Sequence, residues 1–267
     1  MKVALEVAYQ GTRYHGWQRQ EEGVQTVQGT LEAAVATIAN HPVEVSCAGR
    51  TDAGVHAFGQ VVHFDTHSER RMDAWVMGTN AQLPDDISVV RAATVAAEFD
   101  ARHSALARRY VYLIDNHRVR HALLRPNLAR FPWALDEGAM NIAAQALIGE
   151  QDFTSFRAAN CQSLTPMRNV HAVSVTRQGD LVIVDITASA FLYHMVRNIV
   201  GSLLEVGRAR QGTQWIAELL AAKNRSIAGD TAEAAGLYLA SVTYPEGLGW
   251  DNRVSLRHFF GTLGLPN

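Results

Sequence analysis

The sequence predicts an α+β fold made of two similar halves, and three observations lead to this prediction. Short apolar runs with period-two alternation predict strands, and amphipathic segments between them predict helices. The order strand, helix, strand, strand, helix, strand occurs in residues 1–104 and again, with insertions, in residues 105–267. This order is typical of a ferredoxin-like, split-βαβ unit, and 267 residues suffice for two such domains. We therefore expect two antiparallel sheets joined into one extended sheet, with a central cleft between the halves.

The first half should contain four strands and two helices. Apolar, largely β-branched runs predict strands at residues 3–9, 43–47, 60–64 and 87–97. Apolar side chains at helical spacing predict helices over residues 26–39 and 72–81. Thr26 stands at the start of the first helix, where its hydroxyl can accept a hydrogen bond from an unpaired backbone N–H, so we expect it to be the N-cap.

A loop at residues 11–20 contains Tyr14, Trp17 and two arginines. Aromatic rings among arginines suit contacts with the bases and phosphates of a nucleic acid. The alternative is an ordinary loop that is anchored in the protein by its two aromatic rings. Both interpretations fit the sequence equally well.

The second half should repeat this order with insertions. The predicted strands are residues 107–114, 170–176, 181–186 and 237–244, and the middle two should form a hairpin. The predicted helices are residues 136–148, 191–206 and 213–222, with Thr213 as the cap of the last. Residues 151–168 should be a loop, and the arginine-rich residues 118–130 an excursion outside the core. The apolar and aromatic tail, residues 254–267, should dock on the body of the protein.

Composition limits the possible functions. The chain is 48% hydrophobic and 19% charged, which argues against disorder. Its formal net charge of −2 is mild evidence against a nucleic-acid binder. Its 24 basic residues, however, include only Lys2 and Lys223 as lysines, and arginine both binds phosphates bidentately and stacks on bases. A local arginine-lined surface on a nearly neutral protein is therefore consistent with the composition.

The N-terminus and the hydropathy pattern predict a cellular location. Residues 1–9 alternate in polarity, which predicts a strand rather than a signal peptide. No apolar run approaches the roughly 20 residues of a membrane span. We therefore expect a soluble, cytoplasmic protein that contacts no membrane.

Cysteines and histidines suggest no metal site. Two cysteines, Cys47 and Cys161, are too few for a disulfide framework or a zinc set. His56, His63 and His67 match no compact metal-site spacing, and strand alternation would send the first two to opposite faces. We predict no metal.

The candidate site is the turn from Gly49 to Ala57, which reads Gly-Arg-Thr-Asp-Ala-Gly-Val-His-Ala. Two glycines bracket Asp52, and glycine lets the backbone bend sharply and approach a ligand closely. Arg50 stands two positions before Asp52. An acid and a guanidinium on a turn between buried strands indicate a functional site. The alternative is a surface turn in which Asp and Gly only shape the backbone.

Two further positions could join Asp52. Arg197 lies in the largely apolar segment Phe191–Gly201, and a buried unpaired charge is very costly. We therefore expect Arg197 to pair with an acid; the alternative is a side chain that extends its charged end to solvent. Tyr110 follows two arginines at the start of a strand, and on its own it fits a cross-strand core aromatic.

The residues Gly49–Ala57 resemble the signature of the tRNA pseudouridine synthase A family in nine consecutive positions. Further segments resemble the family in the same order along the chain: Tyr9–Gln18, Arg108–Tyr112, Phe153–Arg157, Phe191–Gly201, Gly236–Leu239 and Tyr244–Pro245. These matches extend over most of the chain. On them the chain is identified as a member of this family.

The resemblance implies an isomerase that acts on tRNA. The reaction would convert uridine to pseudouridine at positions 38, 39 and 40 of the anticodon stem-loop, in a homodimer and with neither metal nor organic cofactor. Arginines in residues 11–20 and 102–109 would meet phosphates.

The resemblance also assigns roles to five residues. Asp52 would be the nucleophile, and Arg197 would hold it ionised, because a nearby cation favours the charged form. Tyr110 would be catalytic as well as substrate-binding: it would stack on the flipped uracil and assist removal of the proton at C5. Arg50 would fill the gap left by the extruded base. Leu237 would form a wall of the uracil pocket. Attack of Asp52 on C1′, its addition to C6 and a glycal intermediate all stay open.

Three other functions are compatible with parts of the sequence. A non-catalytic RNA-binding module would fit the sheet pattern equally well. An aspartyl phosphotransferase would need a second carboxylate near Asp52 to hold magnesium, and the turn has none. A glycosidase would need paired carboxylates, of which only one is evident.

Overall fold

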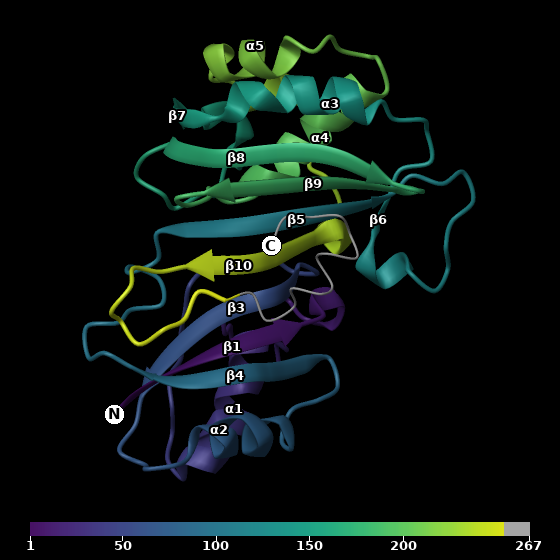
Figure 1. Ribbon diagram of the computed structural model, residues 1–267. Coiled ribbons are helices and arrows are strands. Elements are labelled where there is room, and N and C mark those ends of the chain that lie inside the picture. Colours follow the sequence, from purple (N-terminus) through teal and green to yellow (C-terminus); the bar gives the residue numbers. More distant parts are fainter. Residues whose placement is uncertain (254–267) are drawn as a thin grey trace. The chain divides into compact units, whose positions relative to one another are not determined.

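The computed structural model describes residues 1–253 (Figure 1), so the predicted docking of the tail at 254–267 lies outside the described residues. The chain has mixed helices and strands, which confirms the α+β class. It divides into two compact units, one formed by residues 1–108 together with 238–253 and the other by residues 109–237. The second half was predicted to continue from residue 105 to the end, but the chain instead returns to the first unit at Tyr238.

The first unit contains a mainly antiparallel sheet in the order β4-β1-β3-β10, with β2 also paired to β3. Its strands are β1 (Lys2–Tyr9), β2 (Ser46–Cys47), β3 (His56–Asp65), β4 (Ile87–Val95) and β10 (Leu237–Thr243). The predicted strand at 43–47 is therefore shorter than expected, and β3 begins earlier than residue 60. β10 runs parallel to β3, with Tyr238 opposite His56.

Two helices, α1 (Val27–Ala39) and α2 (Met72–Asn80), complete the first unit. The Thr26 hydroxyl accepts a hydrogen bond from the Gly29 N–H at 3.3 Å, which confirms the predicted N-cap. Trp75 of α2 is fully buried and packs edge-on against Phe64 of β3, with ring centroids 5.2 Å apart. The strand, helix, strand, strand, helix, strand order of β1 to β4 is the predicted split-βαβ unit.

The second unit contains a sheet in the order β5-β9-β8-β7, with β6 paired to β5. Its strands are β5 (Ala107–Asp115), β6 (Ala129–Arg130), β7 (Gly149–Asp152), β8 (Met167–Gln178) and β9 (Leu181–Ala188). β8 and β9 form the predicted hairpin, in which Gly179 has φ +58°. β7 was not predicted, because its sequence, Gly-Glu-Gln-Asp, carries no apolar side chain to reveal a strand.

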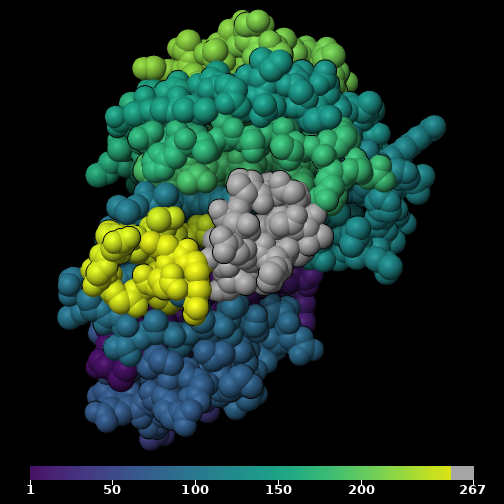
Figure 2. Space-filling view, in the orientation of Figure 1, coloured from purple at the N-terminus to yellow at the C-terminus, as the bar shows by residue number. Residues whose placement is uncertain are grey.

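The second unit also has three helices, α3 (Glu137–Ala144), α4 (Met195–Gly207) and α5 (Trp215–Ala222), of which α3 packs against β8. α4 packs against both of the others, while α3 and α5 lie at the surface of the unit (Figure 2). Short 3-10 turns also occur at Gly11–Arg13, Arg125–Asn127, Gln145–Leu147, Thr154–Phe156, Arg225–Ile227 and Ala234–Gly236. Within residues 1–253, no helix has the length and apolar character needed to cross a membrane.

Two helix starts differ from the predictions. α4 begins at Met195 rather than Phe191, because His194 has φ +60°, a left-handed conformation that a right-handed helix does not accept. Gln214, not Thr213, occupies the N-cap of α5, and it makes no side-chain capping bond. The Trp215 N–H instead donates to the Gly212 carbonyl in a turn. The junction of the two sheets and the central cleft stay predictions.

Candidate functional site

The segment Gly49–Ala57 forms a tight turn that leads from β2 into β3. The Val55 N–H donates to the Asp52 carbonyl at 3.1 Å, and Gly54 has φ +76°, a backbone conformation that favours glycine. Asp52 is half-buried and Arg50 is exposed. The turn therefore presents both charged side chains outside the core of the first unit.

The beginning of the chain fixes this turn. The Trp17 N–H donates to the Thr51 carbonyl at 2.9 Å, and the buried Thr51 hydroxyl lies 2.7 Å from the Tyr9 hydroxyl. The Gly11 N–H donates to Nδ1 of His56 at 3.0 Å, so this nitrogen carries no proton. Asp52 thus stands between two residues, Thr51 and His56, whose positions are determined by Tyr9 and the loop at 11–20.

The aromatic rings of that loop are anchors. Tyr14 is 7% exposed and Trp17 is 1% exposed, so neither ring is available for stacking on RNA. The Tyr14 hydroxyl donates to Asp86 at 2.6 Å, and burial together with this carboxylate raises the pKa of Tyr14. Of the two predicted interpretations, the anchored loop is correct for the rings. Arg13 forms an ion pair with Asp86 at 3.6 Å, but its side chain is 70% exposed and can still meet a phosphate.

Gln60 and Arg108 hold the other side of the turn. Gln60 is fully buried, and its amide exchanges hydrogen bonds with the Gly49 backbone, Nε2 to carbonyl at 2.5 Å and N–H to Oε1 at 3.3 Å. The Arg108 guanidinium donates to the Ala48 carbonyl at 2.9 Å. Neither residue was predicted to support the site. A buried polar residue within an apolar strand was the only signal for Gln60.

The second unit contains Tyr110, on β5. It is 8% exposed, and its ring lies edge-on to Phe191 with centroids 5.0 Å apart. The preceding Arg109 forms a bidentate ion pair with Asp185 of β9, with nitrogen–oxygen distances of 2.6 and 2.9 Å. Because the Arg109 guanidinium is paired with a buried carboxylate and is itself largely buried, the expectation that it meets a phosphate is wrong.

Arg197 lies in the first turn of α4, not in the middle of a helix as predicted. Its Nε donates to the Ala232 carbonyl at 2.8 Å, and the Ala232 N–H donates back to the Arg197 carbonyl at 3.1 Å. These bonds orient the half-buried side chain. The N-terminal end of a helix carries a partial positive charge, so the helix start and the guanidinium both favour an anion close by.

Leu237, the first residue of β10, is 6% exposed. Gly236 precedes it and lies so close to β5 that a Cβ there would be 2.7 Å from the Leu113 carbonyl oxygen. Arg50 and Asp52 belong to the first unit, while Tyr110, Arg197 and Leu237 belong to the second. The pairing of Asp52 with Arg197 therefore stays a prediction.

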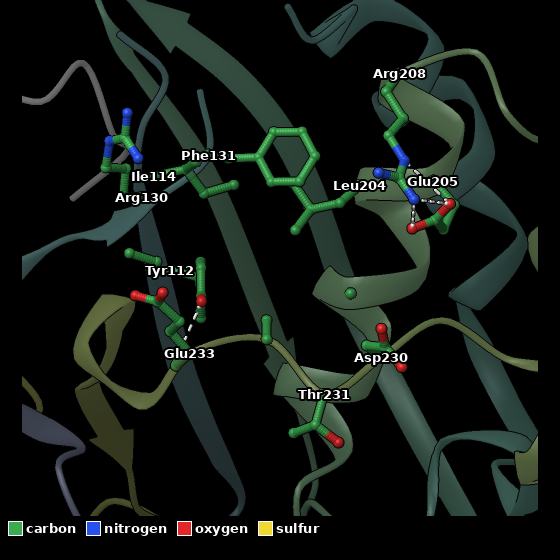
Figure 3. Close-up of a pocket in the computed structure, with 13 residues that line it drawn as sticks. Tyr112, Ile114, Arg130, Phe131, Leu204, Glu205, Arg208, Asp230, Thr231 and Glu233 are labelled. Carbon is green, nitrogen blue, oxygen red and sulfur yellow. Dashed lines mark hydrogen bonds and ion pairs between the residues drawn. The ribbon is translucent and has the colours of Figure 1, made fainter. Parts of the chain in front are cut away.

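A separate cavity of about 250 Å³ lies within the second unit (Figure 3). Apolar side chains, among them Phe131 and Leu204, form part of its lining, and an ion pair between Arg208 and Glu205 borders it. None of the five predicted site residues lines this cavity. Within residues 1–253, no cluster of three or more His, Cys, Asp or Glu side chains could hold a metal ion.

Comparisons with known proteins agree on one family. A model of the tRNA pseudouridine synthase family matches residues 6–104 and 143–245. These segments contain Arg50, Asp52, Arg197 and Leu237, whereas Tyr110 lies in the interval between them.

Curated relatives match the chain over nearly its whole length. The chain is 59% identical over 246 residues to a tRNA pseudouridine synthase A of Shewanella loihica, which covers 92% of this chain and 94% of that protein. It is 56% identical over 267 residues to the protein of the same name from Vibrio campbellii, covering 100% and 99%. A solved structure of a Cbf5-Nop10-Gar1 complex aligns with 98% of this chain and 66% of its own chain, at 12% identity and a TM-score of 0.35. That score is too low to say anything about the fold.

Proposed function

This chain belongs to the tRNA pseudouridine synthase A family, and we propose that it converts uridine to pseudouridine at positions 38, 39 and 40 of the tRNA anticodon stem-loop. Family membership establishes an isomerase that acts on uridine in tRNA. The resemblance of Gly49–Ala57 to the family signature supports the finer assignment. The observation that carries it is the rigid turn at Gly49–Ala57, which presents one half-buried carboxylate, Asp52.

The chemistry is a rearrangement that neither adds nor removes atoms. The C1′–N1 bond breaks, the uracil turns, a C1′–C5 bond forms, C5 loses its proton and N1 gains one. A carboxylate beside the sugar can act as the nucleophile in such a sequence. Asp52 takes this role in our proposal. Attack at C1′, addition at C6 and a glycal route would all use the same carboxylate.

The other four residues act around that step. Arg197 keeps Asp52 ionised and oriented, since an adjacent cation favours the carboxylate form. Tyr110 stacks on the flipped uracil and Leu237 closes the pocket beside it. Arg50, which is exposed on the turn, fills the space that the base leaves in the RNA, where unstacking costs a few kcal/mol.

The decisive variant is Asp52→Asn, which keeps the shape of the side chain and removes its charge. We expect conversion of an unmodified tRNA transcript to fall below detection, while the Kd for that transcript changes less than about twofold. Asp85→Asn is the matched control, because Asp85 is an exposed aspartate of the same unit. Conversion at the wild-type rate by Asp52→Asn would overturn the catalytic assignment.

The remaining parts of the proposal have their own tests. A phosphotransferase would lose activity when divalent cations are removed, whereas this isomerase should keep its rate in EDTA with a tRNA whose fold is maintained by monovalent salt. The proposed homodimer should sediment at twice the chain mass. The tRNA substrate favours a cytoplasmic location.

A further inference from the structure

Tyr193 is an exposed aromatic residue on a fixed backbone. The residue is 43% exposed to solvent. Its carbonyl accepts a hydrogen bond from the Ala158 N–H at 3.2 Å, and its N–H donates to Sγ of Cys161 at 3.4 Å. Because the backbone is already held, a ligand that contacts this ring would immobilise little more than a side chain with two torsions.

The ring of Tyr193 stacks on the ring of His194, with centroids 4.0 Å apart and planes at 28°. Consecutive side chains of an extended segment point to opposite sides. Here His194 has φ +60°, and this left-handed residue allows the two neighbouring rings to lie face to face. Such a conformation is uncommon for a residue other than glycine, and it occurs preferentially at functional sites.

Two arginines lie close to Cys161, the residue that contacts the Tyr193 backbone. Arg157 donates to the Cys161 and Ser163 carbonyls at 2.9 and 2.6 Å. Arg168 donates to the Ser163 hydroxyl at 2.7 Å and to the Thr165 carbonyl at 3.1 Å. All of these acceptors are neutral, so the bonds orient both guanidinium groups without cancelling their charges. An aromatic ring next to positive charge is the combination that proteins use to bind single-stranded nucleic acid.

The segment also continues directly into the candidate site. Phe191 packs edge-on against Tyr110, and Arg197 follows in the first turn of the helix that begins at Met195. A base stacked on Tyr193 would therefore be held by the same short segment that contains Arg197 and Phe191, the residue that packs against Tyr110.

We propose that Tyr193, supported by His194, is a platform on which one base of the tRNA stacks outside the uracil pocket, with Arg157 and Arg168 attracting the adjoining phosphates. This inference rests on the proposed function, which supplies the RNA. Tyr193 is a substrate-binding residue in this proposal. It holds substrate RNA next to the catalytic pocket and touches none of the reacting atoms.

The test compares three variants at one position for binding to an unmodified tRNA transcript. Tyr193→Ala should raise the Kd roughly five- to a hundredfold, the range expected from removing a base–aromatic stack. Tyr193→Leu should behave like alanine, because it restores apolar bulk but no planar ring. Tyr193→Phe should restore binding to within about twofold. The slope of log Kd against log salt concentration should be the same in all of them, since no phosphate contact is removed.

Trp133→Ala is the control, because Trp133 is also an exposed aromatic, at 60%, of the same unit, and its loss should leave the Kd unchanged. Thermal melting establishes that each variant is folded. If Tyr193→Ala is not folded, the comparison of the Kd of Tyr193→Leu with that of Tyr193→Phe decides the question. Wild-type binding by Tyr193→Ala, or by Tyr193→Leu, would overturn the platform. Failure of the wild-type protein to form pseudouridine would instead overturn the proposed function, and the binding comparison would still decide the platform.

Discussion

Gly11 lies so close to Val55 that a Cβ on Gly11 would stand 1.9 Å from the Val55 carbonyl oxygen. The Gly11 N–H also donates to His56, the residue after Val55. The start of the chain and the Asp52 turn are thus in direct backbone contact. No side chain larger than hydrogen fits between them, and neither backbone segment can move aside without breaking strand pairing or turn hydrogen bonds.

Gly11→Ala should therefore disturb both stability and catalysis. We expect a loss of about 1–3 kcal/mol in the free energy of unfolding, the usual cost of overpacking a rigid interior. The rate of pseudouridine formation should fall further, because Asp52 shares the displaced turn. Chemical denaturation and a single-turnover assay measure the two effects.

The control for this change is Gly212→Ala. A Cβ there would first meet the end of a flexible side chain, Oε1 of Gln214 at 3.3 Å. It should alter neither stability nor rate appreciably. An equally small effect of Gly11→Ala would show that the contact between the two segments is not rigid.

The secondary structure followed from local patterns wherever local chemistry decided it. α1 and its Thr26 cap were predicted because periodicity and capping lie within one short segment. The start of α4 was misplaced because residues 191–194 have the apolar pattern of a helix, while the left-handed backbone at His194 depends on tertiary packing. The assignment of β10 to the second half failed for a related reason, since sequence order does not say which unit a returning strand joins.

The candidate site was recognisable in part. Two glycines around Asp52 marked the turn, because that chemistry is local. Gln60 and Arg108 support the turn through hydrogen bonds to the backbone carbonyls of Gly49 and Ala48. These partners are distant in sequence or lie across the turn, and no sequence spacing reveals such bonds. Burial of Tyr14 and Trp17 likewise depends on the strands they pack against.

Asp185→Ala should strongly destabilise the second unit. Arg109 and Asp185 have side chains only 12% and 9% exposed, so removal of the acid takes away the bidentate carboxylate partner of a buried guanidinium. The expected loss is about 3–5 kcal/mol. Replacing both residues by apolar ones, Arg109→Met with Asp185→Leu, should recover most of it. Urea denaturation of the single and double variants measures both values.

An exposed ion pair provides the comparison. Arg71 and Asp73 have side chains 86% and 57% exposed, and Arg71→Ala should cost no more than about 1 kcal/mol. A double variant as unstable as Asp185→Ala would contradict the view that the loss comes from burying the Arg109 charge without its carboxylate.

The stability of the first unit should depend on the protonation of His63. Burial lowers the pKa of His63 below 6.5, and its Nδ1 accepts a hydrogen bond from the Ala101 N–H at 3.0 Å, which a protonated ring could not do. The unfolded chain therefore binds the proton more readily than the folded one. This contribution to stability is present above the unfolded pKa of about 6.5 and is lost as the pH falls toward the lower folded value.

His63→Gln separates this effect from other titrations, because glutamine offers an acceptor oxygen and does not titrate. Between pH 7.5 and pH 5.5 the free energy of unfolding should fall more steeply for the wild type than for the variant. Parallel decline of the two would assign the pH dependence to other groups.

Arg197 should respond differently to substitution by alanine and by lysine. Its Nε donates to the Ala232 carbonyl at 2.8 Å, and in the proposal the same guanidinium also pairs with Asp52. Arg197→Ala removes both functions, so activity should be lost and the melting temperature should fall by several degrees. Arg197→Lys keeps one charge but cannot bond to two partners in a fork. We expect it to recover part of the activity and little of the stability. An unchanged melting temperature in Arg197→Ala would mean that the side chain is solvated rather than paired, and the proposed orientation of Asp52 would then need another source.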